Sequence, residues 1–302
     1  MSKVASAIVT SNRRESDMCR AMILVAVVLL CASLAAPAIA AKIDKVNSAD
    51  GVPIAYAVEG KGSPALVFIH CWSCDMSFWK DQVPYFAKKY QVVTLDLGGH
   101  GQSGTARKDY TIESFAQDVA AVVKAAGLKK VILVGHSMGG PVALEAAKLM
   151  PDKVIGVIGI DTYQNLGQKR APLQMMTVLA GLKTNFKGTV PPFVRGMFPK
   201  TADTTLIARV ASKMASGNPE VGYSAMKNLM TYEAAPTASA LKMPIRSVNS
   251  DLFPTNVEAD QKIAPSYKVT IMPGTGHFLF LENPQKFNEL LAQTIEGILK
   301  QK

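Results

Sequence analysis

The sequence predicts an α/β fold with a mostly parallel central sheet flanked by helices and a mainly helical cap insertion. Hydrophobic residues make up 48% of the 302 residues and charged residues 19%, which excludes a disordered chain. Short apolar runs rich in Val and Ile alternate with segments of helical periodicity, as in chains built from βαβ units. Four cysteines are too few for a disulfide-stapled scaffold. At this length the chain can bury a sizeable core, in one large domain or in two smaller ones.

The expected strands and helices follow one another in a regular order. Two runs on either side of Asp50-Gly51 predict an opening hairpin, Lys42–Asn47 and Ile54–Glu59. Val/Ile-rich apolar runs are typical of buried parallel strands and predict strands at Ala65–His70, Gln91–Leu97, Val131–Gly135 and Val154–Asp161. Two further strands are expected near the end of the chain, at Ile245–Asn249 and Lys268–Met272. Helical spacing predicts helices at Phe78–Lys89, Ile112–Ala126, Met138–Met150 and Pro284–Lys300.

The first forty residues have the pattern of a secretory signal peptide. The segment Met22–Ala40 carries no charge, follows three arginines and ends in Ala38-Ile39-Ala40, the small-residue pattern that a signal peptidase reads. An uncleaved membrane anchor is the alternative, because the apolar run is just long enough to span a bilayer. We therefore expect residues 1–40 to be removed and residues 41–302 to form a secreted or periplasmic domain.

An insertion of eighty residues interrupts the alternation of strands and helices. Residues 162–241 contain helical pieces and no convincing strand, and they are too long for a loop, so we expect a helical cap on the sheet. Six methionines suit the apolar roof of a pocket, although ordinary core packing explains them equally well: Met175, Met176, Met197, Met214, Met226 and Met230.

The cap also carries most of the positive charge. It holds nine basic and three acidic residues, in a chain with a formal net charge of +10. This surplus would attract an anionic substrate or an anionic membrane surface, or it forms an ordinary solvated face. The basic residues form no dense run of the kind found in nucleic-acid-binding arms, so we expect no nucleic-acid partner.

The strongest chemical signal is the segment Gly135-His136-Ser137-Met138-Gly139. It stands between a buried strand and a helix, where its glycines permit a tight turn that strains Ser137 and exposes the hydroxyl. The following helix presents N–H groups and the positive end of its dipole to a developing oxyanion. In this context the G-x-S-x-G pattern predicts a nucleophilic serine rather than a serine that only caps the helix.

Here the chain resembles the α/β-hydrolase superfamily, over nearly all of residues 41–302. The matching segments come in the family's order: Val67–Trp79 is similar to the loop after strand three, Asp96–Ser103 to the turn after strand four, Ser137 to the nucleophile elbow, and Gly276–Phe278 to the catalytic histidine loop. The resemblance implies the α/β-hydrolase fold and a serine hydrolase with a Ser-Asp-His triad. It implies no metal and no organic cofactor.

The resemblance also implies which residues serve as base and acid. Among the four histidines, His277 holds the family's base position, whereas His136 fills the variable position of the elbow, where its side chain would point away. The family order of Ser, acid and His favours Asp251, after the strand predicted at 245–249. Asp161 is the alternative acid, because some members take the carboxylate from the preceding strand. The segment around Asp251 lacks the glycine of the usual G-x-x-D pattern.

Two backbone N–H groups are assigned to the oxyanion hole by the same resemblance, those of Met138 and Trp72. Cys71 stands where the family commonly has a glycine after the histidine, which implies an adapted loop. The sequence leaves open whether Cys71 and Cys74 form a disulfide in an oxidising compartment or remain two buried thiols. A zinc site would need two further ligands, and none stand nearby.

These features predict an exported serine hydrolase that cleaves carboxylic esters through an acyl-enzyme on Ser137. We expect a small-molecule, ester-like substrate with an apolar part. Alternatives with the same fold are a lactonase, a carbon–carbon hydrolase, a thioesterase, a peptidase and a perhydrolase, because the pocket rather than the fold sets the substrate. From other classes, the alternatives are a slow-turnover ligand-binding or signalling protein and a basic surface-adhesion module.

Overall fold

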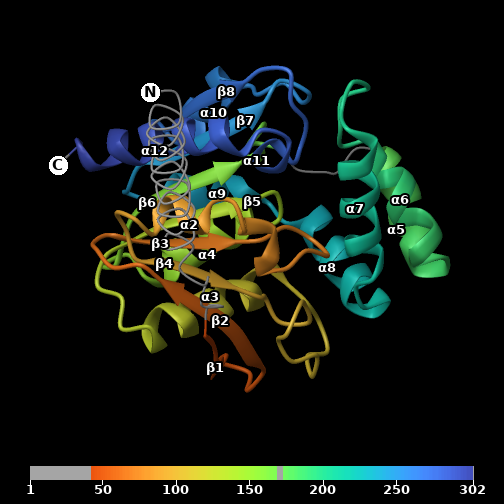
Figure 1. Cartoon of the computed structure of the whole chain (residues 1–302), viewed down its shortest axis with the longest axis horizontal. Helices are drawn as coiled ribbons and strands as arrows, with labels where there is room; N and C mark the ends of the chain where they lie inside the picture. Colours follow the sequence, from red (N-terminus) through yellow and green to blue (C-terminus); the bar gives the residue numbers. More distant parts are fainter. Residues whose placement is uncertain (1–41, 169–172, 302) are drawn as a thin grey trace, which may run out of the picture. The chain divides into compact units, whose positions relative to one another are not determined.

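The computed structural model describes residues 42–168 and 173–301, so the segment read as a signal peptide lies outside the described residues. Within them, eight strands form one sheet in the order β1-β2-β4-β3-β5-β6-β7-β8 (Figure 1). Their bounds are β1 Ile43–Asn47, β2 Pro53–Glu59, β3 Ala65–Ile69, β4 Val92–Leu95, β5 Val131–His136, β6 Val154–Ile160, β7 Ile245–Ser250 and β8 Lys268–Met272. The pairs β1–β2 and β2–β4 are antiparallel and the other five pairs are parallel. The predicted fold class is confirmed.

The central strands are apolar throughout because both of their faces are covered. Every residue of β3, β4 and β5 is buried. Three long helices flank the sheet: α3 (Ile112–Ala125) packs on α4 (Gly139–Leu149), α4 packs on β5 and β6, and α12 (Pro284–Leu299) packs on β7 and β8. A parallel strand with two covered faces appears in the sequence as an unbroken Val/Ile run, which explains why these strands could be predicted.

One predicted helix is wrong. In place of a continuous helix at Phe78–Lys89, the chain forms a 3₁₀ turn, η1 (Met76–Trp79), and a single α turn, α2 (Val83–Phe86). Pro84 lies in the first turn of α2. A proline lacks the N–H group of a helix interior and clashes with the carbonyl four residues earlier, so the helix has to restart just before it.

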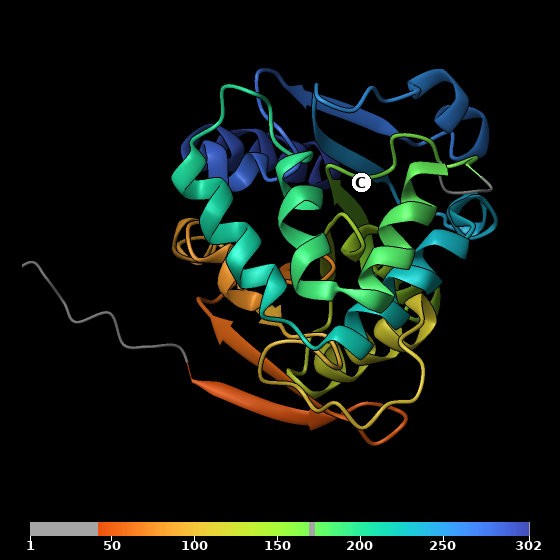
Figure 2. The ribbon, with the colours of Figure 1, turned by 90° about the vertical axis from the view of Figure 1, so that its right-hand side faces the viewer.

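Between β6 and β7 the described residues form five helices and no strand. They are α5 (Leu173–Thr184), α6 (Phe186–Arg195), α7 (Thr204–Ala215), α8 (Pro219–Thr231) and α9 (Ala234–Ala240). The side chains of Asn185, Asp203 and Asn218 cap the N-termini of α6, α7 and α8. Figure 2 shows α5 to α8, in green and teal, lying side by side. Helix α8 also packs on α3, and α9 packs on α4.

Two further short helices lie between β7 and α12. They are α10 (Val257–Ile263), between β7 and β8, and α11 (Leu279–Glu282), just before α12. Among the described residues, no helix is both long enough and apolar enough to cross a membrane.

A buried carboxylate on α10 makes the stability of the fold depend on pH. Asp260 is fully buried, and its Oδ1 accepts a hydrogen bond of 2.6 Å from the N–H of Leu166, while Oδ2 has no partner among the described residues. Burial raises the pKa of Asp260 to about 6. Between the ordinary aspartate pKa of about 4 and this value the folded chain holds a proton that the unfolded chain has lost, so stability falls as the pH rises through this window.

We therefore expect Asp260→Asn to unfold at higher urea concentration than the natural protein at pH 8. The expected gain is about 1 to 2 kcal/mol, and it should shrink toward zero near pH 4, where both side chains are neutral. Urea titrations at the two pH values measure it. A difference that does not change with pH would show that Asp260 ionises normally in the fold.

Candidate active site

Ser137 lies in a tight turn between β5 and α4 whose packing leaves no room for a side chain two residues before it or two residues after it. Its φ of +52° is in the left-handed region, which is unusual for a residue other than glycine. A Cβ atom on Gly135 would stand 2.0 Å from the carbonyl oxygen of Gly139, and one on Gly139 would stand 2.5 Å from that of Ile69. The glycines of the G-x-S-x-G segment are therefore required by the packing of α4 against β5 and β3.

A buried histidine–aspartate pair stands at the same edge of the sheet. His277 follows β8, and its Nδ1 lies 2.6 Å from Oδ2 of Asp161, the residue that directly follows β6. The other carboxylate oxygen, Oδ1, accepts hydrogen bonds of 2.8 Å from both the N–H and the hydroxyl of Ser250. The Asp161 side chain is fully buried and that of His277 is 11% exposed.

The environment keeps Asp161 ionised. Burial by itself raises its pKa, but the hydrogen bond and charge of His277 and the two hydrogen bonds from Ser250 outweigh this effect, so the pKa of Asp161 is below its ordinary value. An ionised carboxylate only accepts hydrogen bonds, so whenever the His277 ring carries a single proton, that proton lies on Nδ1 and Nε2 has a free lone pair. This tautomer is the one a general base needs.

The structure corrects the expected position of Asp251. This residue follows β7 and is exposed, and both of its carboxylate oxygens accept from the N–H of Gly274, at 2.9 and 3.1 Å. It therefore braces the turn after β8 and does not contact His277. Asp161, the alternative acid in the sequence analysis, occupies the position beside the histidine.

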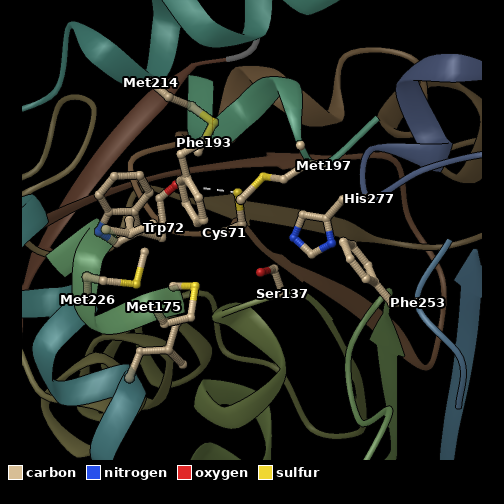
Figure 3. A pocket seen from close by; sticks show the side chains of 13 residues that line it. Cys71, Trp72, Ser137, Met175, Phe193, Met197, Met214, Met226, Phe253 and His277 are labelled. Carbon is tan, nitrogen blue, oxygen red and sulfur yellow. Dashed lines mark hydrogen bonds between the residues drawn. The ribbon is translucent and has the colours of Figure 1, made fainter. Parts of the chain in front are cut away.

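Ser137 and His277 line one cavity of about 420 Å³, and Figure 3 shows both side chains at its wall. They are the only polar lining residues other than Cys71 and Trp72 among those described. Four of the six cap methionines also line it: Met175, Met197, Met214 and Met226. No lysine or arginine of the described residues reaches this cavity, and Lys169 and Arg170 lie outside the described residues. The cavity therefore suits an uncharged, apolar group.

The two expected oxyanion donors belong to two different turns. Met138 is the residue before the first turn of α4, and Trp72 lies in a turn closed by a hydrogen bond of 3.2 Å from the N–H of Cys74 to the carbonyl of Cys71. Within residues 42–168 and 173–301, the N–H groups of Met138 and Trp72 donate to no backbone carbonyl. The Trp72 indole donates to the carbonyl of Gly222 in α8 at 2.7 Å, which ties this turn to the cap.

Cys71 and Cys74 stand together in that turn as free thiols. Their Sγ atoms are 2.8 Å apart, and both side chains are buried. Burial raises the pKa of the Cys74 thiol well above its ordinary value, so that sulfur stays protonated at neutral pH. In the described part of the chain, no cluster of three or more His, Cys, Asp or Glu side chains could hold a metal ion.

His136 contacts the loop of the catalytic-base candidate, a contact that was not predicted from the sequence. Its ring centroid is 4.7 Å from that of His277, and its Nε2 donates a hydrogen bond of 2.8 Å to the backbone carbonyl of His277. Burial and the neighbouring His277 lower the pKa of His136 well below its ordinary value, so the ring is neutral. The His136 side chain does not line the cavity with Ser137. Its hydrogen bond instead holds the backbone of the loop that carries His277. Only the position of His136 next to the serine could have suggested this role.

Comparisons with known proteins show which family the chain is similar to. The sequence model of the alpha/beta hydrolase fold family matches residues 64–215. The chain is 26% identical over 265 residues to 3-oxoadipate enol-lactonase 2 of Acinetobacter baylyi, covering 84% of this chain and 95% of the relative. It is 38% identical over 108 residues to the dihydrolipoyllysine-residue acetyltransferase component of the acetoin cleaving system of Cupriavidus necator, a match to 36% of this chain that spans only 29% of the relative.

A solved structure extends the likeness to three dimensions. Est816, described as an N-acyl homoserine lactone degrading enzyme, matches with a TM-score of 0.73 at 26% identity, covering 83% of this chain and 99% of the other. Together with a family match that spans half of the sequence, this likeness shows that the chain belongs to the α/β-hydrolase family of enzymes.

Proposed function

We propose that this protein is a serine hydrolase that cleaves carboxylic esters through an acyl-enzyme on Ser137. The observation that carries the proposal is that a strained serine and a histidine hydrogen-bonded to a buried carboxylate line one apolar cavity. A serine hydroxyl is a weak nucleophile until a neighbouring base takes its proton. The catalytic set in this proposal is Ser137, His277 and Asp161.

The reaction proceeds in two halves. Nε2 of His277 removes the hydroxyl proton of Ser137 as its Oγ attacks the ester carbonyl, and Asp161 stabilises the imidazolium that forms. The N–H groups of Met138 and Trp72 stabilise the oxyanion. His277 then protonates the leaving alcohol as the carbon–oxygen bond breaks. In the second half it deprotonates a water molecule that attacks the acyl-enzyme and frees Ser137.

Lactone hydrolysis is the second candidate. Two proteins similar to this chain are named as lactonases or lactone-degrading enzymes. A lactone is a cyclic ester, so the same attack opens the ring, and the leaving hydroxyl stays attached to the acyl group. The described lining of the cavity favours an uncharged lactone with an apolar substituent over one that carries a carboxylate, because an unpaired charge is costly to bury.

Burst kinetics on p-nitrophenyl esters test the proposal. We expect a burst equivalent to the enzyme concentration, then steady turnover, and labelling of Ser137 by a fluorophosphonate, located by peptide mass mapping. A burst without turnover would instead support the slow ligand-binding alternative. No burst and no labelled serine would overturn the proposal. Release of acid from uncharged acyl lactones, followed in a pH-stat, decides whether lactones are also substrates.

His136 offers a test of how the base is positioned. We expect His136→Phe to lower kcat about tenfold on p-nitrophenyl butyrate, because it removes a hydrogen bond worth about 1 to 1.5 kcal/mol while keeping an aromatic ring against Phe278 and Phe280. KM should change little, since His136 does not line the cavity. Steady-state kinetics measure both constants. An unchanged kcat with a lower melting temperature would show that the bond only stabilises the fold.

We further propose that the protein is exported and that residues 1–40 are removed. The support is the order of a charged start, an apolar run and Ala38-Ile39-Ala40. N-terminal sequencing of the protein recovered from the periplasm or medium of an expressing bacterium tests it, with Ala41 or a residue close to it expected first. Recovery of the intact chain in the membrane fraction would support the uncleaved anchor.

A further inference from the structure

A second cavity lies directly behind one wall of the first. It measures about 280 Å³ and is lined by the segment that follows β6 and by parts of α8 and α9. Three residues line both cavities: Met175, Met226 and Leu229. A side chain that faces two cavities leaves room for nothing else between them, so the wall is one side chain thick at these residues.

The side chains of this wall are the kind that move easily. Met226 is 3% exposed, so it is enclosed by protein although it borders a cavity on each side. Methionine is unbranched, and its rotatable bonds let it change shape without moving the backbone. Rotation of Met226 toward either side would join the two spaces.

The two cavities differ in chemistry. The first is apolar apart from the residues at the reacting centre. The second combines apolar side chains with hydroxyl and amide groups from Thr162, Gln164, Asn165 and Tyr232. No charged side chain lines it among the described residues. The second cavity therefore suits a neutral group that forms hydrogen bonds, a group that the first cavity would penalise.

We propose that Met226, with Met175 and Leu229, forms a movable partition, and that a long acyl chain bound to Ser137 displaces it and ends in the second cavity. The substrate class is then a neutral ester whose long acyl chain carries a hydroxyl or similar group at its far end. This inference rests on the proposed ester hydrolysis at Ser137.

Chain-length profiles test the partition. We compare kcat/KM for p-nitrophenyl decanoate and butyrate in the natural protein, in Met226→Ala and in Met214→Ala. Met214 is also a buried methionine of the cap, but it lines only the first cavity. We expect Met226→Ala to raise the decanoate-to-butyrate ratio about tenfold, as pocket changes of a methylene or more do, and Met214→Ala to change it less than about twofold.

A substitution that fills the second cavity gives the opposite expectation. Ala234 lines only that cavity, so Ala234→Phe should lower the decanoate-to-butyrate ratio. A terminal hydroxyl distinguishes the two places where a long chain can end. The natural protein should hydrolyse the p-nitrophenyl ester of ω-hydroxydecanoic acid with a kcat/KM at least equal to that for decanoate. A chain folded inside the first cavity would bury that hydroxyl without a partner and lower kcat/KM about tenfold or more.

A crystal structure of the protein labelled on Ser137 with a decyl fluorophosphonate shows the path directly. Electron density for the decyl chain that passes Met226 and enters the second cavity is the expected result. A chain confined to the first cavity, or equal ratio changes in Met226→Ala and Met214→Ala, would overturn the partition while leaving ester hydrolysis intact. Failure of the natural protein to hydrolyse either ester would instead count against the proposed function.

Discussion

Ser137→Ala should lower kcat for p-nitrophenyl butyrate by about five to six orders of magnitude, because it removes the atom that forms the acyl-enzyme. The residual rate should reflect substrate binding and the oxyanion donors alone. Alanine keeps the Cβ atom, so the left-handed backbone at +52° is no more strained than before and the melting temperature should stay within a few degrees. Loss of the burst and of fluorophosphonate labelling, with an unchanged unfolding transition, is the expected result.

Ser73 provides the matched control. It is also a serine in the left-handed region, with a φ of +52°, but it lines a different cavity from Ser137. We expect Ser73→Ala to keep kcat within about threefold of the natural value, as for a substitution that removes no reacting group. If both variants lost turnover equally, the loss would come from the loop backbone, and Ser137 would not be the nucleophile.

The position of Ser137 could be predicted because local packing dictates its neighbours. A Cβ atom on Gly135 or on Gly139 would stand 2.5 Å or less from a backbone carbonyl oxygen, so this turn requires glycine at both positions and the sequence shows it. The buried parallel strands can be recognised in the sequence in the same way, as runs of Val and Ile. The prediction of a helix at Phe78–Lys89 was wrong for a local reason as well, because Pro84 fits only in the first turn of a helix and so a new helix begins just before it.

The partner of His277 could not be predicted in the same way, because it depends on how far each strand runs. Strand β6 pairs with β7 up to Ile160 and Val248, so Asp161 leaves the sheet at that level. Strand β7 continues for two more residues, and Ser250 pairs with Met272 of β8. The chain therefore delivers Asp251 to the turn at Gly274, while the last residue of β7 donates two hydrogen bonds to Asp161. Both aspartates follow a strand, and only the register of the sheet separates them.

The cap methionines could be connected with the cavity from the sequence, but the absence of basic residues from its described lining could not. The count of basic residues in the cap left open an anionic substrate, an anionic surface or an ordinary solvated face. In the structure Lys213, on the cap helix α7, forms an ion pair of 2.6 Å with Asp75 and does not line the cavity. The net charge of a segment does not tell which way its charged side chains point, whereas the lining of a cavity depends on which face of each helix is turned toward it. The methionines of α7 and α8, Met214 and Met226, turn inward.

Asp161→Asn should lower kcat/KM for p-nitrophenyl butyrate about ten-thousandfold with little change in the unfolding transition near neutral pH. The asparagine oxygen can still accept from Ser250, which leaves its amide group facing Nδ1 of His277. An amide donates where the carboxylate accepted, so it favours the His277 tautomer with the proton on Nε2, which cannot take the proton of Ser137. Asparagine also carries no negative charge, so it cannot stabilise the imidazolium of His277 that forms during the reaction.

Asp251→Asn is the matched control, because it makes the same chemical change in the residue that follows the neighbouring strand. Among the described residues, its exposed carboxylate accepts only from the N–H of Gly274, and an asparagine oxygen can do the same, so kcat/KM should stay within about threefold of the natural value. The pair of variants separates the two possible acids, since each hypothesis predicts that one of them is nearly inactive and the other nearly normal. If Asp251→Asn were the inactive one, the hydrogen bond of 2.6 Å between His277 and Asp161 would not be the one used in catalysis.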